Sequence, residues 1–355
     1  MNHLILAVNP GSTSTKVAVF RDYDVVFREE IGHRQEELEG FGSIVEQIPM
    51  RQALVVGAME RHGVRPEDLS AAVGRGGLLP PIQIGGYRVN ERLLDLVLNE
   101  KIPSHASNLG GVIAHGIASA VGKNAYIYDA VSAGDLPDFA RITGFKEIER
   151  RSFYHVLNSR AQAMSYARDK GKSYEDLNLI VVHMGGGITA GAHARGKIVD
   201  SISDDNGPFA PERSGGAPLL TVIDLCYSGE FTKREMMKKV RGMGGLRALL
   251  GTSDAREIMR RVDSGDERAA LVMEAQAYQI AKAAAQLLPA LMGVCDAVIL
   301  TGGLAHSQSL VANVKKYLGP LAPIAVQPGE LEMEALAFGC LRILRGEEEA
   351  REFNV

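Results

Sequence analysis

The fold is decided by residues 4–31, LILAVNPGSTSTKVAVFRDYDVVFREEI. An apolar run ends at a turn of small residues, a second apolar run follows, and a polar turn over residues 21–24 leads into a third run. Runs of this kind, rich in β-branched residues and bounded by turn residues, are typical of strands. This stretch therefore predicts three successive strands joined by tight turns.

The same order of elements recurs in residues 178–200, NLIVVHMGGGITAGAHARGKIVD. A gapless shift places the first small-residue turn on the glycines of the second stretch; it pairs Asn9 with His183, Gly11 with Gly185, Thr15 with Thr189 and Arg21 with Arg195. Few residues are identical in the two stretches. The alternative to a duplication is therefore that two unrelated hairpins resemble each other by chance. The simpler interpretation is a chain with two similar halves.

Helices and further strands are predicted around these two stretches. The expected helices span residues 90–100, 108–121 and 265–291, with another that follows the basic passage at 145–160 and ends near Gly171. The expected strands span residues 125–131 and 297–303, and residues 207–218 form an irregular loop rich in Gly and Pro. Alternating strands and helices predict α/β layers, and the basic passage is the expected junction between two domains.

Composition agrees with a globular protein of about two domains. The chain has 355 residues, of which 46% are hydrophobic and 23% are charged, which is close to the average for folded proteins. Lys plus Arg number 39 and Asp plus Glu number 43, for a net charge of −4. No segment concentrates basic residues into a stripe, so nucleic acid is not an expected partner.

No export signal or membrane segment is predicted. The first apolar run is short and ends at Asn9 and Pro10. The apolar segment at 283–300 is interrupted by Gln286, Pro289 and Asp296 before it reaches the roughly 20 residues that a membrane span needs. We therefore expect no membrane partner and a cytoplasmic location.

The cysteines point to a reducing compartment. The chain has 3 cysteines, far apart and without a CxxC motif, which favours free thiols in the cytoplasm. The sequence also lacks an HExxH motif and a Cys/His cluster at zinc spacing. Any metal is therefore expected to be a hard cation with oxygen ligands.

Three turns of small residues follow apolar runs, and each is a candidate phosphate site. Such turns leave backbone N–H groups uncovered, and hydroxyl side chains add donors without bulk. The candidate residues are Ser12 and Ser14 with their neighbours after Asn9, then Gly185, Gly186 and Gly187, and finally Gly302 and Gly303. A tight turn that requires positive φ is the structural alternative at each position. Three such turns, two of them in repeated units, favour phosphate binding.

Two better-known phosphate motifs are absent. Gly171-Lys172-Ser173 ends like a P-loop, but Tyr166 stands where the first glycine is required and a helix precedes the segment. The dinucleotide-binding pattern G-x-G-x-x-G/A is matched in sequence by Gly185, Gly187 and Ala190. The residues that follow predict a hairpin, whereas that motif needs a helix there, so a dehydrogenase is not expected.

Four motifs together resemble the acetate and butyrate kinase family. They are NPGSTSTK at 9–16, GRGGLLPPI at 74–82, HMGGGITAGAH at 183–193 and TGGLAH at 301–306. The butyrate kinases are the nearer branch, because the acetate kinases have an arginine where this chain has Ala72, a G-N-G turn where it has Gly185-Gly186-Gly187, and a somewhat longer chain.

The resemblance implies the fold of the acetate and sugar kinase, heat-shock chaperone and actin superfamily. This is an α/β, duplicated ribonuclease-H-like fold, an actin-like ATPase of two domains with the nucleotide in a cleft between them. The first domain would contain residues 1–150 plus about 335–355, because the C-terminal helix returns to it in the related enzymes, and the second residues 151–334. The resemblance also implies a homo-oligomer, a dimer or larger.

The implied activity is reversible, direct in-line phosphorylation of a short-chain carboxylate, most specifically butyrate, by ATP to give an acyl phosphate and ADP, with Mg²⁺. The residues carried over to catalysis are Asn9, Arg75, Asp129, His155 and Arg213. Ser12 and Ser14 would lie near the transferred phosphate. Gly185, Gly186 and Gly187 would form the second phosphate-binding turn. The nucleotide would be held by Asp254, Arg256, Gly302 and Gly303. Glu332 would bind Mg²⁺, and Glu330 and Glu334, which flank it, are the alternative ligands.

Each role has a structural alternative. Asp129 could end a strand, His155 could be a junction residue, and the two arginines could form surface ion pairs worth at most about 1 kcal/mol. The sole role of Glu332 could be to place a negative charge at a helix N-terminus. At the level of function, the alternatives are a kinase of the same fold acting on another acid or a sugar, and a non-kinase actin-like ATPase.

Overall fold

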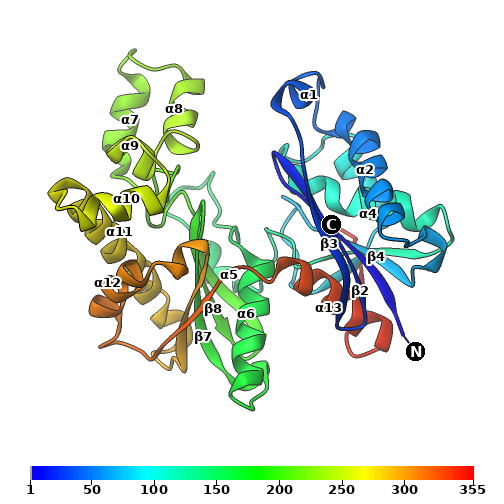
Figure 1. Ribbon diagram of the computed structural model, residues 1–355. Coiled ribbons are helices and arrows are strands. Elements are labelled where there is room, and N and C mark those ends of the chain that lie inside the picture. Colours follow the sequence, from blue (N-terminus) through cyan, green and yellow to red (C-terminus); the bar gives the residue numbers. More distant parts are fainter. Residues whose placement is uncertain (1) are drawn as a thin grey trace. The chain divides into compact units, whose positions relative to one another are not determined.

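The computed structural model describes residues 2–355, which form two compact units (Figure 1). The first unit contains the residues up to Gly134 together with Leu331–Val355, and the second contains Asp135–Glu330. The second unit is therefore inserted between the two segments of the first. Within residues 2–355, each helix is too short or too polar to span a bilayer.

Residues 135–150, expected in the first domain, belong to the second unit because they bond to its sheet. The N–H of Asp135 donates to the carbonyl of Ile198 (2.7 Å). Arg150 pairs with Asp200 (2.6 Å) and donates to the carbonyl of Ser201 (3.0 Å). The chain thus changes units after Gly134, ahead of the basic passage.

The first unit is built on a seven-stranded mixed sheet in the order β12-β5-β6-β4-β1-β2-β3. Its strands are β1 (Leu4–Pro10), β2 (Ser14–Arg21), β3 (Asp24–Gly32), β4 (Ala71–Arg75), β5 (Gly86–Arg88), β6 (Asn124–Tyr128) and β12 (Arg351–Glu352). Its helices are α1 (Gln35–Glu39), α2 (Ile48–Arg61), α3 (Glu91–Leu98), α4 (Leu109–Ser119) and α13 (Glu332–Arg345). Strands β1, β4 and β6 are parallel, so their carboxyl ends meet at one edge.

Helices α4 and α13 cover opposite faces of this sheet. A Cβ on Gly111 of α4 would lie 2.5 Å from Ile127, and one on Gly339 of α13 would lie 2.6 Å from Tyr128. Ile127 and Tyr128 are consecutive in β6, and consecutive strand residues face opposite sides. Glycines therefore let both helices approach the strands closely.

The second unit is built on a five-stranded mixed sheet in the order β11-β10-β7-β8-β9. Its strands are β7 (Asn178–Met184), β8 (Ile188–Ala194), β9 (Lys197–Ile202), β10 (Ala297–Gly302) and β11 (Ile324–Pro328). Its helices are α5 (Asp138–Arg141), α6 (Val156–Asp169), α7 (Leu219–Tyr227), α8 (Lys233–Val240), α9 (Gly245–Leu250), α10 (Ala255–Asp263), α11 (Glu267–Gln286) and α12 (Gln308–Leu318).

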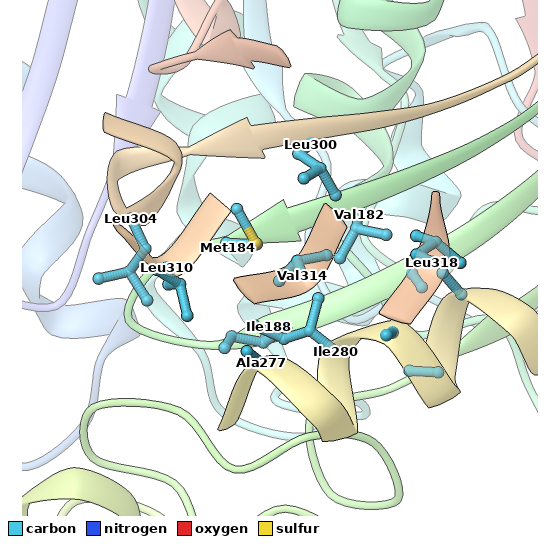
Figure 2. Packing of buried hydrophobic residues seen from close by; sticks show 14 of the residues in the cluster. Val182, Met184, Ile188, Ala277, Ile280, Leu300, Leu304, Leu310, Val314 and Leu318 are labelled. Carbon is cyan, nitrogen blue, oxygen red and sulfur yellow. The ribbon is translucent and has the colours of Figure 1, made fainter. Parts of the chain in front are cut away.

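Alternate residues of these strands pack against different helices. Val182 and Leu300 belong to the large core cluster with residues of α11 and α12, including Ile280 and Val314 (Figure 2). Val181 and Ile299, one position earlier in each strand, pack instead with alanines of α6. Both faces of the central strands are therefore buried, which explains their continuous apolar sequences.

The two sheets repeat one another, which confirms the predicted duplication. Strand β1 runs antiparallel to β2 and parallel to β4, and β7 likewise runs antiparallel to β8 and parallel to β10. A β-bulge interrupts the second hairpin of each unit, between Val19 and Phe20 and between Ala192 and His193. A bulge at the same place in both units is a detail that two unrelated hairpins would not share.

The expected gapless alignment fails at the first turn. Pro10 pairs with Thr15 across the first hairpin, whereas Met184 pairs with Ile188, so the second turn is one residue shorter. Beyond the turn the equivalences move by one position, and Lys16 rather than Thr15 corresponds to Thr189. Asp22 and Arg195 then become equivalent, and both have left-handed backbones, with φ of 53° and 48°.

The other predicted elements are present. Helix α3 begins after Asn90, whose side chain accepts a hydrogen bond from the N–H of Leu93 (3.1 Å). Helices α4, α6 and α11 and strands β6 and β10 fall within or close to the predicted ranges. The long apolar helix stops at Gln286, and a short 3₁₀ turn follows at Leu288–Leu291, because Pro289 cannot continue an α-helix.

Candidate active site

Three of the predicted residues meet at the carboxyl edge of the first sheet. Asn9 lies at the end of β1, Arg75 ends β4, and Glu332 is the first residue of α13. The amide of Asn9 donates to Glu332 Oε2 (2.7 Å), and the Arg75 guanidinium lies 3.3 Å from Glu332 Oε1. Asn9 and Glu332 are only 4% and 7% exposed. A charged carboxylate at this depth needs such partners.

Asp129 lies beside this group because it directly follows β6. Its strand neighbour Tyr128 pairs with Arg75 in the parallel register. The backbone of Asp129 is left-handed, with φ of 43°, which is uncommon for a residue other than glycine, Asn or Asp. Its carboxylate accepts from the N–H of Gly85 (2.8 Å), and its own N–H donates to the Gly85 carbonyl (3.1 Å). These two bonds hold the buried side chain at the strand end.

The turn between β1 and β2 contains the predicted Ser12 and Ser14. Ser12 is exposed, while the hydroxyl of Ser14 donates to Glu30 Oε1 on β3 (2.7 Å). The turn closes on itself through the N–H of Gly11, which donates to the carbonyl of Ser14 (2.7 Å). Ser14 is therefore engaged by the neighbouring strand, and Ser12 faces solvent.

The glycine turns of the second unit lie at the ends of β7 and β10. Gly185 donates its N–H to the carbonyl of Gly187 (3.0 Å), which closes the tight turn around Gly186. Gly302 has φ of 86°, and a Cβ there would lie 2.5 Å from the carbonyl oxygen of Met184. Gly303 has open space around the position of a Cβ. Glycine is thus required at 302 by both conformation and close approach.

Arg213 packs on the first of these turns. A Cβ on Gly187 would lie 2.1 Å from Arg213 Nη1. Arg213 forms an ion pair with Asp204, which also pairs with Arg241 (2.8 Å). Burial, with a further contribution from the charge of Arg241, lowers the pKa of Arg213 to about 10, so the guanidinium is still charged at neutral pH. One buried carboxylate therefore pairs with two arginines, of which Arg213 packs on the glycine turn.

His155 lies against a second histidine that sequence reasoning missed. The rings of His155 and His183 are stacked, with centroids 3.8 Å apart and an interplanar angle of 10°. His155 Nδ1 lies 2.9 Å from Thr189 Oγ1, and His183 Nδ1 lies 3.0 Å from Asn158 Nδ2. His183 Nε2 is also 3.7 Å from Glu330. The signal that could have found His183 is its equivalence to Asn9 in the repeat.

Asp254 and Arg256 lie at the start of α10. The Asp254 side chain caps the helix by accepting from the N–H of Arg256 (2.9 Å), and the two side chains also pair with each other (3.3 Å). The Arg256 side chain is 91% exposed. Hydrogen bonds and ion pairs within residues 2–355 do not join this pair to the glycine turns.

The donor chemistry fits a Mg²⁺ ion delivered with a nucleotide. In the described residues 2–355, no group of three or more His, Cys, Asp and Glu side chains could enclose a metal. Mg²⁺ usually keeps several waters and takes one or two carboxylates together with phosphate oxygens. Glu332 offers one buried carboxylate of this kind, at the end of the parallel strands.

Two units of this topology, with their turns at the carboxyl ends of parallel strands, define an actin-like ATPase fold. Residues 150–326 match the model of the Acetokinase family. This segment of the chain is therefore similar to the Acetokinase family.

Solved structures are similar to this chain in fold. An acetate kinase from Porphyromonas gingivalis has 17% identity and a TM-score of 0.79, covering 96% of this chain and 100% of that chain. A propionate kinase from Francisella tularensis has 17% identity and a TM-score of 0.74, covering 95% and 98%. An acetate kinase from Entamoeba histolytica has 14% identity and a TM-score of 0.76, covering 98% and 99%.

Proposed function

We propose that this protein is an ATP-dependent carboxylate kinase that converts a short-chain carboxylate to an acyl phosphate, with butyrate as the first candidate substrate. The match of residues 150–326 to the Acetokinase family carries this proposal. The motifs at 74–82 and 183–187, which resemble those of butyrate kinases, favour butyrate over acetate. The same motifs favour a carboxylate over a sugar, and a kinase over a filament-forming ATPase.

In the proposed reaction, a carboxylate oxygen attacks the γ-phosphorus of ATP. A new P–O bond forms, the bond to the β-phosphate oxygen breaks, and ADP leaves. A carboxylic acid with a pKa near 4 is already ionised at neutral pH, so no general base is required. The main obstacle is repulsion between anions, about 4 kcal/mol per pair of unit charges at 4 Å and an effective dielectric constant near 20.

Cationic side chains would offset this repulsion. We assign Arg75 to the carboxylate, since its guanidinium already accommodates the carboxylate of Glu332 at 3.3 Å. We assign Arg213 to the transferring phosphoryl group, since it lies on the glycine turn at Gly187. A planar guanidinium can hold a carboxylate or phosphate through two parallel hydrogen bonds. His155 would donate a hydrogen bond to an oxygen of the same phosphoryl group.

Glu332 and Asn9 would hold Mg²⁺, which neutralises phosphate charge when it is bound. Asp129 would accept a hydrogen bond from a water at the same strand edge. Ser12 and Ser14 would lie near the transferred phosphate. In the turns at 185–187 and 302–303 the N–H groups of Gly185 and Gly302 donate to the carbonyls of Gly187 and Gly329, so Gly186, Gly187 and Gly303 would donate to the phosphates through their backbone N–H groups. Asp254 and Arg256 are proposed for the nucleoside end of ATP. In this scheme the protein works in the cytoplasm, on a small acid, as a homo-oligomer.

The test is to incubate the protein with Mg-ATP, butyrate and hydroxylamine, which traps acyl phosphate as a hydroxamate. We expect hydroxamate well above the level of a control without acid. Straight and branched acids of two to five carbons, used in parallel, identify the preferred chain. Hydroxamate at the control level with every acid would falsify the proposed function, and turnover with acetate alone would remove butyrate from it.

A further inference from the structure

A buried arginine lies directly beneath the turn between β1 and β2. Arg51 of α2 is 0% exposed. Its Nη1 donates to the carbonyl oxygens of Gly11 (3.0 Å) and Ser14 (3.2 Å) and to Thr15 Oγ1 (2.9 Å). Its Nε and Nη2 donate to Gln47 Oε1, at 3.1 and 2.9 Å. One guanidinium therefore joins the turn to helix α2.

The charge of Arg51 has no carboxylate to balance it. All of these acceptors are uncharged, and within residues 2–355 no carboxylate forms an ion pair with Arg51. Burial lowers its pKa without opposition from a nearby acid. A buried charge is costly unless it is paired. An anion bound on the outer side of the turn would provide the missing counter-charge.

Arg51 also determines which way the turn presents its N–H groups. A trans peptide bond places a carbonyl and the following N–H on opposite sides. Because the carbonyl of Gly11 is turned inward to Arg51, the N–H of Ser12 points outward. Neither Ser12 nor Thr13 donates its N–H to an acceptor within residues 2–355. Both residues are exposed.

His33 supports the turn from the same side. Its N–H donates to the carbonyl of Thr13 (2.8 Å), and its Nε2 lies 2.8 Å from Thr15 Oγ1. Burial, and then the charge of Arg51, lower the pKa of His33, which favours the neutral imidazole. The positive charge beneath the turn is thus that of Arg51, and the carbonyls of Gly11, Thr13 and Ser14 all face inward.

We propose that Arg51 is a positioning residue that fixes the β1–β2 turn so that the N–H of Ser12 meets a phosphate oxygen, while its charge attracts that oxygen from beneath. This role rests on the proposed kinase function, and it adds a residue of α2 that touches no substrate. Rigid placement of donors matters because small displacements of a reacting group lower its rate steeply.

The first test compares the kinetics of Arg51→Met and Arg51→Lys with Arg61→Met. Arg61 is a matched control, since it lies on the same helix, is exposed and pairs with Glu29 (2.6 Å). We expect Arg51→Met to lower kcat about 10- to 100-fold, with KM for the acid unchanged. Arg51→Lys, which keeps the charge, should recover part of the loss. An Arg51→Met enzyme with wild-type kcat and only a lower Tm overturns the proposal.

The second test does not depend on turnover. Hydrogen exchange of a peptide covering residues 9–16 is measured by mass spectrometry with and without inorganic phosphate. We expect phosphate to slow exchange in the wild type and in Arg61→Met, but not in Arg51→Met. Equal protection in the Arg51→Met protein overturns the proposal. If Arg51→Met does not fold, Thr15→Val removes one of the acceptors of Arg51 and should weaken the protection.

The two proposals fail in different ways. If no acid yields hydroxamate but phosphate protection of the turn depends on Arg51, the kinase function is wrong, and what stands is that Arg51 fixes the turn for phosphate binding. If butyrate yields hydroxamate and the Arg51 variants match the wild type in kcat and exchange, the role of Arg51 is wrong and the kinase function stands.

Discussion

Asn9 and Glu332 are joined by a hydrogen bond of 2.7 Å, although 322 residues separate them along the chain. Asn9 is the penultimate residue of the first strand, and Glu332 begins the last helix. Both are nearly inaccessible to solvent. The bond therefore links the first and last parts of the first unit at the edge where Arg75 and Asp129 also lie.

Glu332→Gln tests the proposed metal carboxylate. The amide keeps the shape of the side chain but loses the charge, so we expect the Mg²⁺ concentration for half-maximal turnover to rise by at least about tenfold. Glu334→Gln, two residues later and paired with Arg28 in the wild type, is the control and should behave as the wild type. A Glu332→Gln enzyme with unchanged Mg²⁺ dependence would remove Glu332 from the metal site.

Arg213→Ala tests the cationic clamp. Loss of an arginine that stabilises a transferring phosphoryl group costs of order 10³-fold in kcat. Binding of Mg-ATP, followed by titration calorimetry, should be retained. Arg247→Ala is the control, because Arg247 is an exposed arginine paired with Glu212 (3.0 Å). Wild-type turnover in Arg213→Ala would contradict the assignment.

Gly302→Ala and Gly303→Ala form a matched pair for stability. At Gly302, φ of 86° and the carbonyl of Met184 both oppose a side chain, whereas Gly303 has open space. We expect Gly302→Ala to lower the free energy of unfolding by about 1 to 3 kcal/mol and Gly303→Ala to change it little. Urea unfolding measures both. Equal stability of the two variants would show that the backbone of Gly302 relaxes.

His193 makes the protein sensitive to acid. Complete burial, with a smaller effect of Arg160, lowers the pKa of His193 to about 3. Between the unfolded-state value of about 6.5 and that value, only the unfolded chain gains the proton, so the free energy of unfolding falls as the pH falls. The slope from this one group is at most about 1.4 kcal/mol per pH unit.

His193→Gln should therefore show a shallower decline in unfolding free energy between pH 6.5 and 4 than the wild type, whatever its stability at pH 7. Tyr174→Phe is the control, since it removes the 2.7 Å hydrogen bond to His193 Nδ1 but keeps the imidazole. Its decline should remain as steep as that of the wild type. Parallel curves for His193→Gln and the wild type would assign the acid sensitivity to other groups.

The sequence alone predicts the parts of this fold that depend on local pattern. Both sets of three strands, the Asn90 cap and the glycine turns follow from apolar periodicity and turn residues. It could not predict the one-residue difference between the two first turns, because the change lies in strand register rather than in composition. Thr15 and Arg21 were therefore paired with the wrong partners in the second unit.

The residues of the candidate site likewise fall into those that the sequence predicts and those that only the structure identifies. The sequence shows Asn9 and the glycines plainly, because they lie at or just after the ends of apolar runs. His183, Asp204 and Arg51 are buried, and their roles depend on partners outside the elements that contain them. Among the three neighbouring glutamates, only the structure distinguishes Glu332, which meets Asn9, from Glu330 and Glu334, which meet His183 and Arg28.

The division of the first unit into two segments has a consequence for biosynthesis. The ribosome makes Leu4–Pro10 first, but the helix that packs against this strand, α13, emerges only after all of Asp135–Glu330 has been translated. The second unit can thus complete its core while the first still exposes one face of its sheet. Nascent chains halted before α13 therefore still expose apolar surface that a chaperone could cover.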